Sequence, residues 1–86
     1  MAKIEIANQQ LPVSASVKYR STDEKDVTQV VAKKSTVKST KDVSPGSIIK
    51  VTVGAGASKE IKYETGNKTL LILQEGGQNN FGLKWG

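Results

Sequence analysis

The chain has 86 residues, with 13 Lys and Arg against 8 Asp and Glu and a formal net charge of +5. This length supports one modest hydrophobic core, so we expect a single domain over residues 1–86. The chain contains neither cysteine nor histidine, which excludes disulfide bonds, the usual zinc and haem ligands, and Ser-His or Cys-His nucleophile pairs. We therefore expect no metal, no cofactor and no enzymatic activity.

The first residues carry charges at Lys3 and Glu5, and no long apolar run follows them. A signal peptide or a membrane span requires such a run. We therefore expect a cytoplasmic protein, and export without a cleaved signal remains an alternative.

Residues 3–6 and 13–20 alternate apolar and polar side chains. This period of two is typical of a strand with one face buried and one face in water. The pattern predicts strands whose inner faces carry the apolar residues Ile4, Ile6, Val13, Val17 and Tyr19.

Residues 22–34 permit two interpretations. Ser21 and Glu24 have the spacing of a helix capping box, and Val27, Val30 and Val31 share a helical face. Stiff β-branched valines and threonines favour a strand instead. We expect the strand, with a helix packed on a sheet as the alternative.

A basic stretch follows, with four lysines in the nine residues from Lys33 to Lys41 and no acid among them. A strand here places Lys34 and Lys38 on one face and Lys33 and Lys41 on the other. Lysines on both sides of a polar strand protect a sheet edge against pairing with other chains. We expect such an edge or a solvated loop. The alternative is a site for nucleic acid or another polyanion, formed by Lys33, Lys34, Lys38 and Lys41.

Alternation returns in residues 48–53 and 59–64. The turn at residues 44–47 contains Pro45 and Gly46, and Gly54 and Gly66 mark further turns. A Pro-Gly-Ser turn followed by an alternating strand resembles a pattern of small immunoglobulin-like sandwiches. These segments predict hairpins, with turns also at residues 54–58 and 75–80.

Residues 70–73 form an uninterrupted apolar run, Leu-Leu-Ile-Leu, before the alternating residues 81–85. A strand that is apolar on both faces needs cover on both faces. We expect Leu71 and Leu73 to lie in the core. The opposite face, with Leu70 and Ile72, is covered within the chain or, as the less favoured alternative, by another chain.

Together these segments predict an all-β fold, a small antiparallel β-sandwich or barrel of about seven strands. The alternative is an α+β fold with one helix near residues 22–34. The remaining residues expected in the core are Val31, Ile49, Val51, Val53, Ile61, Tyr63, Phe81 and Leu83.

Three functions are compatible with this sequence. The leading one is a non-catalytic binding or structural module that contacts a protein partner or its own copies, with Leu70, Ile72 and Trp85 at the interface. The second is binding of nucleic acid or another polyanion through the basic stretch. The third is a lectin-like or membrane-surface module centred on Trp85, because an aromatic ring near a chain end can contact a sugar or a lipid surface.

Overall fold

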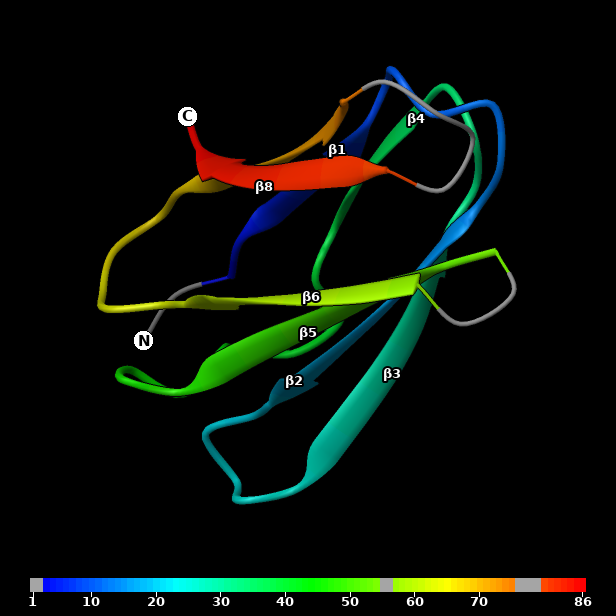
Figure 1. Cartoon of the computed structure of the whole chain (residues 1–86). Helices are drawn as coiled ribbons and strands as arrows, with labels where there is room; N and C mark the ends of the chain where they lie inside the picture. The colour runs from blue at the N-terminus through cyan, green and yellow to red at the C-terminus, as the bar shows by residue number, and fades with distance from the viewer. Residues whose placement is uncertain (1–2, 55–56, 76–79) are drawn as a thin grey trace.

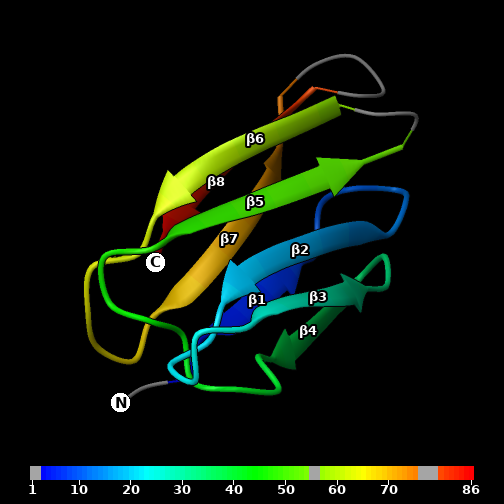
Figure 2. The same cartoon turned by 90° about the horizontal axis from the view of Figure 1, so that it is seen from below.

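The computed structural model describes residues 3–54, 57–75 and 80–86. These residues form two four-stranded sheets packed face to face, as Figures 1 and 2 show from two sides. The predicted all-β sandwich is therefore confirmed, with eight strands where about seven were expected. The strands are β1 (Glu5–Asn8), β2 (Ala15–Arg20), β3 (Asp26–Val31), β4 (Ser35–Lys38), β5 (Ile48–Val53), β6 (Ala57–Lys62), β7 (Thr69–Gln74) and β8 (Phe81–Trp85).

The first sheet has the strand order β4-β1-β7-β8, and the second has the order β3-β2-β5-β6. All neighbouring strands are antiparallel except β1 and β7, which run parallel. The first sheet thus contains strands from both ends of the chain, whereas the second consists of two hairpins, β2-β3 and β5-β6, that pair through β2 and β5 (Figure 2).

The helix considered for residues 22–34 is wrong, because β3 occupies the second half of this segment. The residues that resemble a capping box build the turn before β3 instead. The Ser21 hydroxyl donates to the Asp23 carboxylate and to the Lys25 carbonyl at 3.0 Å, and Glu24 has a left-handed φ of 64°. No helix in the described part of the chain is long and apolar enough to cross a membrane.

The core lies between the two sheets and contains most of the residues predicted for it. Val13 is an exception: it precedes β2 and is 40 % exposed, so its predicted place in the core is wrong. Ile61 and Leu83 are partly buried at the margin of the core. The predicted residues that are buried are Ile4, Ile6, Val17, Tyr19, Val31, Ile49, Val51, Val53, Tyr63 and Phe81. Further members of the hydrophobic core, absent from the list of expected core residues, are Leu11, Ala15, Val43, Leu70 and Ile72.

The strand predicted in the basic stretch is β4, and it lies at the edge of its sheet. Its outer hydrogen-bonding side is not left open, because the Gln29 side chain on β3 lies against it. The Gln29 amide nitrogen donates to the Lys38 carbonyl at 2.9 Å, and its amide oxygen accepts from the Thr40 N–H at 3.2 Å. One side-chain amide thus takes the place of a neighbouring peptide group and closes this edge.

Replacing Gln29 with methionine is expected to reopen the edge of β4. Methionine retains the approximate size of the side chain but can bond neither the Lys38 carbonyl nor the Thr40 N–H. We expect the free energy of unfolding to fall by about 1 kcal/mol, the net contribution typical of such bonds. Native-state hydrogen exchange provides the specific measurement: the Thr40 amide should exchange faster by a larger factor than the Val17 amide in the core, which reports only the loss of global stability. Unchanged exchange at Thr40 would contradict the proposed role of Gln29.

Two of the predicted turns fall partly outside the described residues. The turn predicted at 54–58 includes residues 55–56, and the turn predicted at 75–80 includes residues 76–79. The turn at 44–47 is described, and there the Ser47 N–H donates to the Ser44 carbonyl at 3.2 Å while Gly46 has a φ of 81°. Glycine accommodates this left-handed conformation without a steric penalty.

Candidate functional site: a basic hollow on the β4-β1-β7-β8 sheet

The structure separates the four lysines predicted to bind a polyanion. Lys33 and Lys34 lie between β3 and β4, in the turn rather than on a strand. Lys34 has a left-handed φ of 59°, and its ammonium donates to the Gln9 carbonyl at 3.2 Å. The strand phase assumed for Lys33 and Lys34 is therefore wrong, because the chain reverses direction at these residues.

Lys41 is directed to a different neighbour. Its ammonium lies 3.6 Å from the carboxylate of Asp23, and both side chains are about half exposed. The pKa of Asp23 is lowered, first by the hydrogen bond from the Ser21 hydroxyl and then by the charges of Lys41 and Lys25. Lys41 therefore lies beside an acid in the turn before β3, and this acid offsets its attraction for an external anion.

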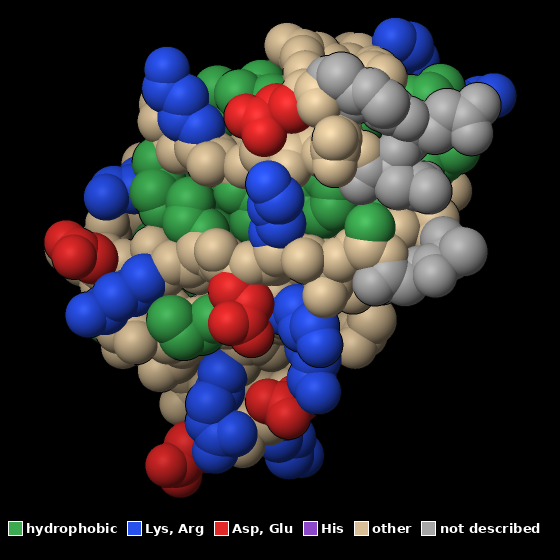
Figure 3. Space-filling view, viewed as in Figure 1, with side chains coloured by type: hydrophobic (Ala, Val, Ile, Leu, Met, Phe, Trp, Pro, Cys, Tyr) green, Lys and Arg blue, Asp and Glu red, His purple; other side chains and the backbone are tan. Residues whose placement is uncertain are grey.

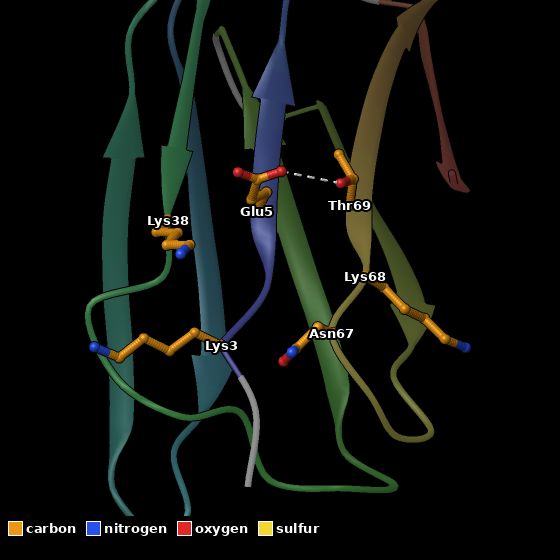
Figure 4. Close-up of a pocket in the computed structure, with 6 residues that line it drawn as sticks. All are labelled: Lys3, Glu5, Lys38, Asn67, Lys68 and Thr69. Atoms are coloured by element: carbon orange, nitrogen blue, oxygen red, sulfur yellow. Dashed lines mark hydrogen bonds between the residues drawn. The ribbon is translucent and has the colours of Figure 1, made fainter.

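Lys38 lines a hollow that has a volume of about 300 Å³, and the other three lysines are not in its lining. Lys38 ends β4 and lies opposite Glu5 of β1 in the antiparallel register. The outer side of the sheet is hollowed where β1 and β7 begin beside the end of β4. The lining residues, all shown in Figure 4, are Lys3, Glu5, Lys38, Asn67, Lys68 and Thr69.

Three lysines surround this basic hollow, whereas its lining contains one carboxylate. Glu5 is already engaged, because its Oε1 atom accepts a hydrogen bond from the Thr69 hydroxyl at 3.3 Å. In Figure 4 the side chains of Lys3 and Lys68 extend to opposite sides, and Asn67 lies between them. The hollow thus has a lysine on each flank, with the two ammonium groups directed apart, and an amide in the middle, so an anionic ligand must be long enough to reach both flanks.

Lys3 and Lys68 were not predicted as site residues, because they lie far apart along the chain. Lys3 precedes β1 and Lys68 precedes β7, and these two strands are parallel neighbours. Parallel pairing brings the starts of both strands to one end of the sheet, where the antiparallel neighbour β4 ends with Lys38. The sequence does show a lysine at the start of each of two predicted strands. This placement indicates a cluster of lysines only if the two strands pair in parallel.

A second hollow, of about 340 Å³, lies on the outer face of the other sheet. It is lined by Lys18, Arg20 and Lys50 together with Asp26 and Glu60. The Asp26 carboxylate lies 3.9 Å from Lys18 and 3.6 Å from Arg20, and Lys50 faces Glu60 across β5 and β6. Because two acids offset its three cations, this hollow is less suited to an anion than the basic hollow.

Trp85 is partly buried against the core. Its ring centroid lies 5.7 Å from that of Tyr63, and its indole N–H donates to the Lys62 carbonyl at 3.0 Å. The Lys68 ammonium lies 5.8 Å from the same ring, within the range of a cation–π contact. Burial and the charge of Asp42 raise the pKa of Tyr63. The ring of Trp85 is therefore partly occupied by contacts within the chain.

The apolar run of β7 has the opposite phase from the one predicted. Leu70 is 0 % exposed and Ile72 is 1 % exposed, so both lie in the core. Leu71 and Leu73 point outward and are partly exposed. The prediction that Leu71 and Leu73 lie in the core is wrong. Leu70 and Ile72 are covered within the chain, which was the favoured interpretation of their face, so they do not lie at a free surface. An interface on the outer face of β7 would use Leu71 and Leu73.

Neighbouring strands explain this phase. Parallel pairing places Leu70 beside Ile6 of β1 and Leu71 beside Ala7. Glu5 lies on the solvent face, so the next residue, Ile6, points inward. Leu70 is paired with Ile6, and its side chain therefore also points inward. Leu71 also covers the end of the chain, because a Cβ atom at Gly86 would lie 2.9 Å from its Cδ1 atom.

Within the described residues, no group of three or more acidic, cysteine or histidine side chains is arranged to hold a metal ion. Comparison of the chain with models of known protein families, with curated proteins and with solved structures finds no significant match.

Proposed function

We propose that this protein is a non-catalytic binding module that recognises a polyanion at the basic hollow. The observation that carries the proposal is that Lys3, Lys38 and Lys68, from three separate segments, all line one hollow with a single acid in its lining. Clustered cations on one face are a common electrostatic feature of proteins that bind nucleic acid or other polyanions.

A polymer suits this site better than a small anion. Lys3 and Lys38 are exposed and Lys68 is only partly buried, and an ion pair in such a setting contributes about 0 to 1 kcal/mol. A single small anion would therefore bind weakly. A polymer that contacts several lysines at once also releases its condensed counterions, which adds a favourable entropy for each contact.

Replacing both Lys38 and Lys68 with glutamine is expected to weaken binding to a short double-stranded DNA or to heparin. Loss of two contacts should reduce the slope of log K against log salt concentration by about 1.8 on DNA, since each contact contributes about 0.9. Fluorescence titration at several salt concentrations measures this slope. Heparin and DNA, compared side by side, distinguish a sulfated from a phosphorylated polymer.

The matched control removes the same charge from the other sheet. Lys18 and Lys50 line the second hollow, and their replacement with glutamine should leave the slope nearly unchanged if contacts concentrate at the basic hollow. Equal effects of the two double variants would show a general effect of net charge, and the proposal would then fail. It would also fail if the unmodified protein did not bind either polymer at low salt.

The module centred on Trp85 is less well supported. A lectin-like or membrane-surface site needs an exposed ring face, whereas Trp85 packs against Tyr63, lies beneath Lys68 and uses its N–H within the chain. We therefore place the ligand at the basic hollow.

A further inference from the structure

The free edge of β8 is a second surface of interest. Strands β7 and β8 are antiparallel, and the Gly86 N–H donates to the Thr69 carbonyl at 2.8 Å. Because bonding direction alternates along an antiparallel strand, Lys84 and Gly82 also face β7, while the peptide groups of Phe81, Leu83 and Trp85 face away. Within the described part of the chain, no backbone bond to these three outward-facing residues is found.

The side chains along this edge are more apolar than those of a protected edge. Phe81 is buried, and Leu83 and Trp85 are partly buried at the margin of the core. Ala57 and Ile61 on β6 lie at the same margin. Figure 3 shows a band of hydrophobic surface at the level between β8 and β6. A free strand with such a margin is suited to pairing with another strand.

The outer face of β8 carries complementary charges at defined positions. Gly82 has no side chain, and the Glu75 carboxylate takes the space above it, since a Cβ atom at Gly82 would lie 2.5 Å from Glu75 Oε2. Lys59 of β6 lies 3.7 Å from the other carboxylate oxygen. Lys84, two residues along β8 from Gly82, is exposed on the same face. This face thus presents an acid above Gly82 and a base at Lys84.

We propose that β8 pairs antiparallel with β8 of a second copy of this chain, with Leu83 on the two-fold axis. Phe81 then lies opposite Trp85 of the second copy, and Gly82 lies opposite its Lys84. This register places each Lys84 ammonium beside the Glu75 carboxylate that covers Gly82 of the other copy. The two four-stranded sheets join into one of eight strands, and the partly exposed Leu83 and Trp85 become covered.

The alternative registers are less favourable. An antiparallel pair that joins outward-facing peptide groups can slip only in steps of two residues. A slip in one direction places Lys84 opposite Lys84 of the second copy, where like charges repel. A slip in the other direction places Gly82 opposite Gly82 and leaves both Lys84 side chains without the acid. The edge of β8 is thus complementary to itself in one register. This favours a second copy of the chain, rather than an unrelated strand, as its partner.

Lys59 gives this edge a measure of protection in the monomer. Its ammonium lies 6.0 Å from the centroid of the Phe81 ring as well as beside Glu75. It must move aside, or share the carboxylate with Lys84 of the second copy, when β8 pairs. We therefore expect a weak dimer with a dissociation constant of about 10 μM to 1 mM, as is typical of a small interface.

Sedimentation equilibrium over this concentration range tests the proposal, and amide exchange identifies the edge. As protein concentration rises, the Phe81, Leu83 and Trp85 amides should become protected. The Gly82 and Lys84 amides, already directed to β7, should show little change. A strict monomer at about 1 mM, or a dimer without this alternating pattern, would overturn the proposal.

A charge exchange supplies the decisive variants. Both Lys84→Glu and Glu75→Lys place like charges opposite each other twice in the homodimer, so each should weaken dimerisation by about tenfold or more. An equimolar mixture of the two variants restores both opposite-charge pairs and should dimerise like the unmodified chain. Lys50→Glu, the same charge change on the other sheet, is the control. The proposal fails if the mixture does not recover. DNA binding by the basic hollow is measured separately, so the two proposals can fail independently.

Discussion

Replacement of Ile72 with alanine is expected to lower the free energy of unfolding by about 2 to 5 kcal/mol. Ile72 is 1 % exposed and packs in the core between the two sheets. Its truncation removes buried apolar surface and leaves a cavity that the surrounding strands fill only in part. For a domain of this size, such a loss is a large fraction of the total stability. Urea unfolding followed by tryptophan fluorescence or circular dichroism measures the change.

Leu73 provides the matched control, because it is the next residue of the same strand and points outward. Leu73→Ala should cost less than about 1.5 kcal/mol, since much of its surface is already in contact with water. The ratio of the two losses in unfolding free energy shows which face of β7 is buried. If Leu73→Ala were the more damaging change, the observed orientation of this strand would be wrong.

Replacement of Asn8 with alanine is the second large expected effect. Asn8 is 0 % exposed, at the end of β1. Its side-chain NH₂ group lies 3.0 Å from the Val13 carbonyl, 3.2 Å from that of Val31 and 3.4 Å from that of Ala32. This one side chain therefore connects the end of β1 to the loop before β2 and to the end of β3.

We expect Asn8→Ala to cost about 2 to 3 kcal/mol, because the buried bond to the Val31 carbonyl and the part-buried bonds to the Val13 and Ala32 carbonyls are then lost together. Gln9→Ala is the control: the Gln9 side chain donates to the Thr36 hydroxyl at an exposed position, and its loss should cost about 0.5 kcal/mol or less. Thermal and urea unfolding of both variants provide the measurement. Similar stabilities for the two variants would refute a central role for Asn8.

Local patterns in the sequence are sufficient for the fold class. Alternation in residues 13–20 and 48–53 predicts β2 and β5, because a strand exposes every second side chain to water and the pattern reports that exposure directly. The same reasoning identifies Ser35–Lys38 as an edge strand, since lysines within a polar strand are tolerated where no neighbouring strand covers them. Each of these inferences needs only residues that are adjacent in the chain.

The pattern is uninformative where both faces of a strand are apolar. Leu70 and Leu71 are chemically alike, and alternation cannot distinguish their faces. The distinction arises from Ile6 and Ala7 on the neighbouring β1, whose own orientation is determined by Glu5. The role of Gln29 is not visible in the pattern either, because its partners are Lys38, the last residue of β4 in the other sheet, and Thr40, which follows β4.

The amino-acid sequence by itself determined that this protein is all-β and that it lacks the histidine and cysteine needed for many catalytic and metal sites, and it limited the basic stretch to an edge strand or a solvated loop as the favoured interpretation. Only the tertiary structure decided which face of β7 is buried and which lysines form a cluster. Lys3, Lys38 and Lys68 surround one hollow because β1 pairs with both β4 and β7. Proximity within a sheet depends on strand pairing between distant segments, whereas the spacing of residues along the chain records only the local conformation.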